Sequence, residues 1–198
     1  MKYDVIIAGV GGQGVLSLGA IIASAAMEEG LAVKQSEVHG MAQRGGAVQA
    51  NLRLASGPVA SDMVPKGGAA MILGMEPLES LRYLDYLAPD GTLITATDPV
   101  CNIPDYPDLA AVLAQIRRLP HSVLVEAESL ARREGNPRGV NVVMVGAASR
   151  WLPVRETTLR RNIEQRFAAR GAAVVAANLR LFDAGLRAAA GEQPAPRA

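Results

Sequence analysis

The sequence has few residues that bind metals or form crosslinks. Its 198 residues include one cysteine, Cys101, and two histidines, His39 and His121. A single thiol excludes an internal disulfide, which is typical of a protein of the reducing cytoplasm. It also excludes an iron–sulfur cluster held by this chain alone, because such clusters need several thiolates. Without a group of cysteines and histidines, a structural zinc site is not expected. We therefore expect a cytoplasmic chain that binds no metal.

Long apolar runs and a strong net charge are also missing. No apolar stretch approaches the length of a membrane span, and the N-terminal run MKYDVIIAGV is too short for a signal peptide. The net charge of +1 argues against a general nucleic-acid binder. Aromatic residues make up only 4% of the chain, yet 49% of the residues are hydrophobic, which is enough for a full core. We expect neither nucleic acid nor membrane among its partners.

The hydropathy pattern alternates between buried strands and helices. It starts with a strand at Tyr3–Val10, a helix at Gln13–Glu29 and a strand at Leu31–Val38. These elements predict a β-loop-α-β unit with a parallel strand pair and a right-handed crossover. After a half-exposed strand at 47–56, the expected elements are strands at 69–75, 92–97 and 121–127 and helices at 76–87, 109–119, 128–135, 140–152, 155–170 and 172–190.

This order of elements predicts the α/β class. We expect a Rossmann-like, open, mostly parallel sheet flanked by helices, with a helical C-terminal third. Residues 1–190 should form a single domain, and the polar, proline-containing residues 191–198 a disordered tail. From Arg117 onward there are 14 arginines and seven acidic residues, which indicates a solvated helical surface, with a docking surface as the alternative.

The stretch GVGGQG at 9–14 has the spacing G-x-G-x-x-G between the first strand and the first helix. Gly9 permits a tight turn, Gly11 lets the backbone approach a ligand, and Gly14 lets the helix pack close to the strand. The helix N-terminus then offers N–H groups to an anion. A ribose-binding acid is expected near the end of the second strand, and Glu37 comes slightly late. The motif favours an anion site over NAD; the alternative is that the glycines only serve close packing. The candidate residues of this loop are Gly9, Gly11, Gly12, Gln13 and Gly14.

A second candidate loop, SEVHGMAQRGG at 36–46, follows the second strand. Arg44 is a fixed cation with five donors, suited to phosphate or carboxylate. Gly45 and Gly46 can turn backbone N–H groups toward the same anion. Open α/β sheets bind ligands at the strand ends where both loops are expected, although an interface loop without a ligand is the alternative. The candidate residues here are Ser36, Glu37, His39, Gln43, Arg44, Gly45 and Gly46.

Several stretches carry a family resemblance. GVGGQGVLSLGAIIASAA, QSEVHGMAQRGGAVQANLRL and SDMVPKGGAAMILGMEPLESLRYLDYL resemble the gamma-type domain of the 2-oxoacid:ferredoxin oxidoreductase family. The resemblance extends through NVVMVGAASRWLP and so covers nearly the whole chain. HGMAQRGG is more similar to the indolepyruvate branch of the family, in which such a chain is a beta subunit, than to the pyruvate branch.

The resemblance implies an oxidoreductase that decarboxylates a 2-oxoacid such as indolepyruvate with coenzyme A, giving an acyl-CoA, CO2 and reduced ferredoxin. Thiamine diphosphate and [4Fe-4S] clusters would lie in a partner alpha subunit, since this chain has no GDG motif with a following asparagine pair and only one cysteine. The chain would be an obligate beta subunit of an alpha2beta2 assembly, inactive alone and without a catalytic residue of its own. Its two loops would bind coenzyme A, another anion or the alpha subunit.

Two other classes of function stay open. A free-standing NAD(P)-dependent oxidoreductase would need a catalytic Tyr–Lys or His pair, and the four tyrosines and three lysines show no such spacing. A nucleotide-binding regulatory module would be favoured by tight binding of a ligand to the isolated chain.

Overall fold

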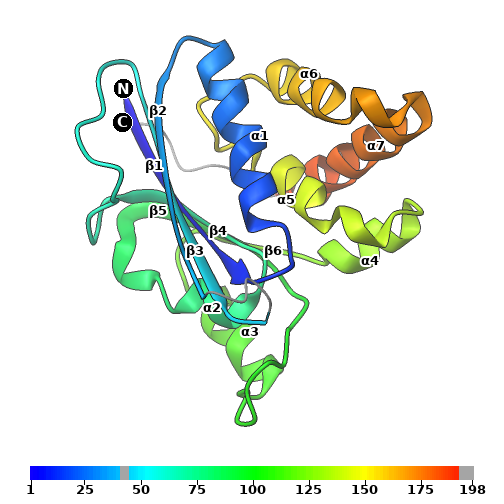
Figure 1. The fold of residues 1–198 in the computed structure, drawn as a ribbon. Helices are drawn as coiled ribbons and strands as arrows, with labels where there is room; N and C mark the ends of the chain where they lie inside the picture. The colour runs from blue at the N-terminus through cyan, green and yellow to red at the C-terminus, as the bar shows by residue number, and fades with distance from the viewer. Residues whose placement is uncertain (41–44, 192–198) are drawn as a thin grey trace.

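The computed structural model describes residues 1–40 and 45–191. These residues contain a six-stranded sheet in the order β2-β3-β1-β4-β5-β6, with helices packed on both of its faces (Figure 1). The strands are β1 (Lys2–Val10), β2 (Ala32–His39), β3 (Ala47–Ala55), β4 (Ala69–Gly74), β5 (Leu87–Ala96) and β6 (Ser122–Val125). The helices are α1 (Val15–Glu28), α2 (Pro77–Leu81), α3 (Leu109–Arg117), α4 (Ala127–Arg133), α5 (Val140–Ala148), α6 (Glu156–Phe167) and α7 (Ala172–Ala188), with 3-10 turns η1 (Leu84–Tyr86), η2 (Pro137–Gly139) and η3 (Ala168–Arg170).

The strand directions confirm the predicted fold class and correct one pairing. β1 is parallel to β4, β4 to β5 and β5 to β6, whereas β3 pairs antiparallel with both β1 and β2. Five strands therefore share one direction, and β3 opposes them. The predicted direct pair between the first and second strands is wrong, because β3 lies between β1 and β2.

The position of β3 inside the sheet explains a second correction. This strand was expected to be half exposed, but Arg53 is only 8% exposed. Its guanidinium donates to both carboxylate oxygens of Asp4 at 3.0 Å, and to the carbonyls of Ser61 and Met63 at 3.0 and 2.9 Å. A buried charge is tolerated when it is paired and hydrogen-bonded in this way. The segment after β3 thus lies against the sheet face that carries Asp4 and Arg53.

The hydrophobic core has two parts, one on each face of the sheet. Alternate residues of β1 divide between them: Val5 and Ile7 belong to the larger part and Ile6 to the smaller. The larger part includes side chains of α1, α5 and α7, and the smaller one includes side chains of α3. At the crossing of α5 and α7, a Cβ atom on Gly185 would lie 1.9 Å from the carbonyl oxygen of Val143, so only glycine fits.

Helix boundaries differ most between residues 76 and 92. The helix expected at 76–87 ends at Leu81 as α2, and β5 starts at Leu87, earlier than expected, because Leu87 already pairs with Ala69 of β4. Within the described residues, no helix is both long and apolar enough to cross a membrane. Of the expected disordered tail at 191–198, residues 192–198 lie outside the described part of the chain.

Candidate functional site

The glycine loop joins β1 to α1 in a conformation that glycine favours. Gly12 and Gly14 have φ angles of 103° and 84°, in the left-handed region that other residues seldom adopt. Gly9 serves close packing, because a Cβ atom there would lie 2.9 Å from the side chains of Gln13, Met75 and Val15. The backbone angles and the close packing are therefore enough to explain these glycines, without a bound ligand.

The side chain of Gln13 holds the loop against the neighbouring strand. Its Oε1 accepts a hydrogen bond from the backbone N–H of Val10 at 2.8 Å, and its Nε2 donates to the carbonyl of Met75 at 3.0 Å. Met75 follows the end of β4, so Gln13 connects the ends of two adjacent parallel strands. Since both polar atoms of the amide are engaged, Gln13 supports the shape of the loop.

The two candidate loops meet, as predicted. The N–H of Gly11 donates to the carbonyl of Gly46 at 2.8 Å, and the N–H of Gly45 donates to the carbonyl of Gly11 at 3.1 Å. Two other predicted residues, Gln43 and Arg44, lie outside the described residues. Gly45 and Gly46, at the end of the second loop, therefore lie directly against the glycine loop.

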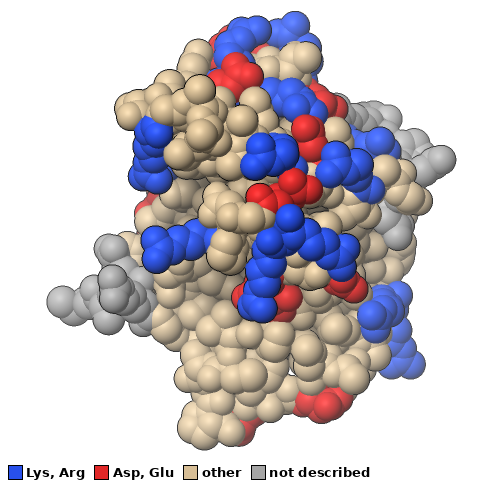
Figure 2. Space-filling model, turned by 90° about the vertical axis from the view of Figure 1, so that its right-hand side faces the viewer, with Lys and Arg blue, Asp and Glu red and all other residues tan. Residues whose placement is uncertain are grey.

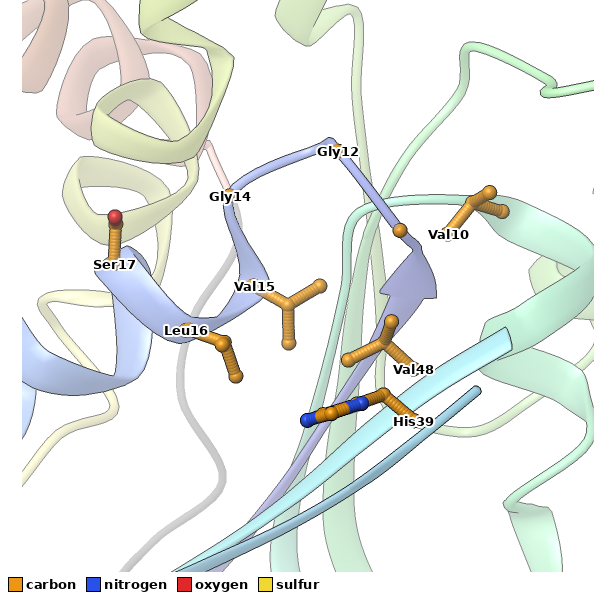
Figure 3. A pocket seen from close by; sticks show the side chains of 9 residues that line it. Val10, Gly12, Gly14, Val15, Leu16, Ser17, His39 and Val48 are labelled. Carbon is orange, nitrogen blue, oxygen red and sulfur yellow. The ribbon is translucent and has the colours of Figure 1, made fainter. Parts of the chain in front are cut away.

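A pocket of about 260 Å³ lies beside the first turn of α1. Gly12, Gly14 and Ser17 line it together with His39 and Val48. Figure 3 shows the His39 ring reaching from the end of β2 toward the start of α1. The N-cap of α1 is Gly14, which has no side chain to satisfy the first N–H groups. The pocket therefore combines the positive end of a helix dipole with an imidazole, which suits an anionic group.

Two predicted residues point away from one another across β2. Glu37 lies on the same sheet face as His39 and accepts a hydrogen bond from Gln35 Nε2 at 3.0 Å. Ser36 lies on the opposite face, where its hydroxyl is 3.4 Å from the carbonyl of Asp62. Alternation along a strand explains the separation. The structure thus brings His39, but not Ser36, to the pocket at the glycine loop.

A second pocket, of about 370 Å³, also touches Gly12 and was missed by the sequence analysis. Asp98, Glu128 and Arg138 line it together with Gln13. Asp98 accepts the N–H of Glu128 at 3.0 Å, and burial raises the pKa of Asp98. These side chains come from the loop after β5, from α4 and from η2, so no local motif marks them. The position of Asp98 just after a parallel strand was the one available signal.

The arginine-rich C-terminal helices carry paired charges. Figure 2 shows lysines and arginines interspersed with acidic side chains on this side of the molecule. Arg161 pairs with Glu28, and Arg155 with Glu29 at 3.1 Å. Burial raises the pKa of Glu29, but hydrogen bonds from Thr158 and Arg155 outweigh it, so the net shift is downward. This pairing agrees with a solvated helical surface.

Comparison with known proteins gives matches along nearly the whole chain. Residues 4–188 match the family model described as pyruvate ferredoxin/flavodoxin oxidoreductase. The chain is 37% identical over 153 residues to an indolepyruvate oxidoreductase subunit IorB from Archaeoglobus fulgidus, covering 74% of this chain and 75% of that one. It is 34% identical over 199 residues to the subunit of the same name from Methanothermobacter thermautotrophicus, covering 96% and 99%.

A solved structure shares the fold. The 2-oxoglutarate:ferredoxin oxidoreductase from Magnetococcus marinus, with 2-oxoglutarate, coenzyme A and succinyl-CoA bound, superposes with a TM-score of 0.77 at 22% identity. The match covers 98% of this chain, which spans only 32% of the length of that one. The same architecture therefore occurs as one part of a longer polypeptide.

Proposed function

The chain belongs to the pyruvate ferredoxin/flavodoxin oxidoreductase family, and on that premise we propose that it is the beta subunit of an indolepyruvate:ferredoxin oxidoreductase. The observation that carries the proposal is the match to an indolepyruvate oxidoreductase subunit over 96% of this chain and 99% of that relative. The assembly would convert an aryl 2-oxoacid and coenzyme A into an acyl-CoA and CO2, with ferredoxin as electron acceptor. This subunit would be a cytoplasmic chain with a single domain over residues 1–190. It would take part in the reaction only within the complex and be inactive alone.

The residues of this chain do not fit the redox cofactors of such an assembly. Cys101 is its one cysteine, and a [4Fe-4S] cluster needs several thiolates. Among the residues that the structure describes, no group of three or more histidine, cysteine, aspartate or glutamate side chains could hold a metal ion. We therefore assign the clusters to an alpha subunit, in an alpha2beta2 complex. We assign thiamine diphosphate to the same subunit, because this chain has no GDG motif followed by an asparagine pair.

We assign the joined loops to an anionic group, with the phosphates of coenzyme A as the candidate. The support is the first turn of α1, which Gly14 leaves without a side-chain cap, and the adjoining pocket that reaches His39. The relative from Magnetococcus marinus was solved with coenzyme A bound. Arg44 would supply the pairing cation. The alternative is that the same loops contact the alpha subunit.

The substrate assignment is tested on the purified complex. Reduction of a viologen dye is measured with indolepyruvate, pyruvate and 2-oxoglutarate as the varied substrate. We expect the highest kcat/KM with indolepyruvate. A higher value with pyruvate or 2-oxoglutarate would overturn the substrate assignment and leave the family assignment intact.

The ligand assignment is tested with Arg44→Ala in the same complex. Loss of a charge-assisted contact should raise KM for coenzyme A about ten- to hundredfold, without loss of assembly. Arg133→Ala is the matched control, because Arg133 is exposed on α4 and lines neither of the two pockets that touch the glycine loop. An unchanged KM in a normally assembled complex would exclude a role for Arg44 in binding coenzyme A.

A further inference from the structure

The loop at 97–108, between β5 and α3, is held firmly at both ends. The N–H of Thr97 donates to the carbonyl of Val125 at 2.9 Å, next to β6. At the other end, Asp108 caps α3 by accepting the N–H of Ala111 at 2.9 Å. The sequence suggested no role for this proline-rich loop. These hydrogen bonds fix the positions of both ends of the loop and so limit the positions that a side chain in its middle can take.

A buried carboxylate holds the middle of this loop. Glu76 lies just beyond the end of β4 and is 1% exposed. Its Oε2 accepts the N–H of Glu79 at 2.7 Å, while its Oε1 accepts the N–H of Val100 at 3.4 Å and the hydroxyl of Tyr106. A buried carboxylate requires such donors. Two of the three donors come from the loop, so satisfying Glu76 fixes the path of residues 100–106.

Tyr106 is suited to this task because it stays protonated. Burial raises its pKa, and the hydrogen bond to Glu76 raises the pKa further. The hydroxyl therefore keeps its proton to a higher pH than an ordinary tyrosine and can donate to Glu76. The hydroxyl of Tyr106 and the carboxylate of Glu76 together hold the loop close to the end of β4.

Asn102 connects this loop to the candidate site. Its Nδ2 donates to the carbonyl of Gly45 at 2.6 Å. Gly45 in turn donates its N–H to the carbonyl of Gly11, and Gly11 donates its own N–H to Gly46. A continuous chain of contacts thus runs from Glu76, at the end of β4, through Asn102 to the glycine loop at the end of β1.

We propose that Asn102 is a positioning residue that holds Gly45 and Gly46 against the glycine loop, and that Glu76 and Tyr106 fix Asn102 in place. Asn102 is exposed, so its substitution leaves the core intact. The consequence for catalysis rests on the proposed function, because only a ligand-binding loop would change a Michaelis constant. The consequence for the loop itself does not depend on what the loop binds.

The test compares Asn102→Ala and Asn102→Asp in the assembled complex by amide hydrogen exchange at Gly11 and Gly45. Loss of one hydrogen bond should speed exchange about three- to tenfold. Aspartate should be at least as damaging as alanine, because an ionised carboxylate cannot donate to a carbonyl. Tyr106→Phe should show a smaller increase, and Asp105→Ala, an exposed change in the same loop, should show none.

KM for coenzyme A, measured on the same variants, separates the two proposals. Positioning of a binding loop predicts a KM raised by a similar factor with kcat nearly unchanged. Faster exchange with an unchanged KM would support the positioning role and overturn the assignment of the loops to coenzyme A. Exchange equal to that of the unaltered protein in both Asn102 variants would overturn the positioning role, whatever the KM.

Discussion

Replacing Gln13 with alanine should destabilise the chain, because this side chain joins the ends of two strands. The amide accepts from the N–H of Val10 and donates to the carbonyl of Met75. Val10 is 2% exposed and Met75 1%. Gln13→Ala would leave one backbone donor and one backbone acceptor without these partners in a buried setting.

The size of the effect follows from those two groups. An unsatisfied buried polar group costs about 1–3 kcal/mol, so two groups could cost about 2–6 kcal/mol. The second pocket is lined by both Gln13 and Met75, so water can reach the vacated space. We therefore expect the lower part of this range, a loss of about 2–3 kcal/mol in the free energy of unfolding.

Urea unfolding of the purified chain measures this loss. With a slope of about 2 kcal/mol per molar urea, the midpoint should fall by about 1–1.5 M. Gln115→Ala, an exposed change on α3, is the control and should shift the free energy by less than about 0.5 kcal/mol.

Gln13→Glu sharpens the test. It keeps an acceptor for Val10 but sets a second oxygen against the carbonyl of Met75. Protonation would restore a donor, so the folded state should raise the pKa of the new carboxyl, and this variant should regain stability as the pH falls. A loss below about 0.5 kcal/mol in Gln13→Ala, together with a pH-independent deficit in Gln13→Glu, would refute the structural role of Gln13.

Three further changes test the fold. Gly185→Ala should lower the unfolding free energy by about 1–3 kcal/mol in urea titrations, because its Cβ would meet the carbonyl of Val143; wild-type stability would contradict the close helix crossing. Arg53→Met should cost about 2–3 kcal/mol by the same assay, since it leaves the carboxylate of Asp4 buried with only the ammonium of Lys2, at 3.1 Å, as a charged partner, and Asp4→Asn combined with it should recover part of the loss. Burial raises the pKa of Glu79, so its contribution to stability is most favourable below the ordinary value of 4.5 and declines as the pH rises through the folded-state pKa. The urea midpoint of Glu79→Gln should therefore vary less with pH, between 4.5 and the raised folded-state pKa of Glu79, than that of the unaltered chain. The same pH dependence of the midpoint in both proteins would contradict the burial effect.

The sequence predicted the features that depend on local patterns. The first strand, which ends at Val10, and the first helix, which starts at Val15, lie within two residues of where their periodicity placed them. The expectation that both loops lie at strand ends also correctly placed Gly45 beside the glycine loop. Features that depend on distant partners were missed. Arg53 in an alternating strand indicates a solvent-facing position, until its partner Asp4, 49 residues away, is known.

The chain of contacts around Glu76 was hidden for the same reason. Its donors include Tyr106, 30 residues along the chain, and the residue that this loop presents, Asn102, contacts Gly45 from 57 residues away. No motif marks such a set, because the spacing is set by the packing of separate elements. Only the folded chain brings these side chains together.

Reconstitution with an alpha subunit tests the central claim most directly. Three samples are prepared: this chain alone, the alpha subunit alone, and the two expressed together. Each is assayed for coenzyme-A-dependent reduction of a viologen dye by indolepyruvate. The proposal predicts a stable complex and activity only when both chains are present. Absence of a complex, together with tight binding of a nucleotide to this chain alone, would contradict the proposal and identify the glycine loop as an independent nucleotide site.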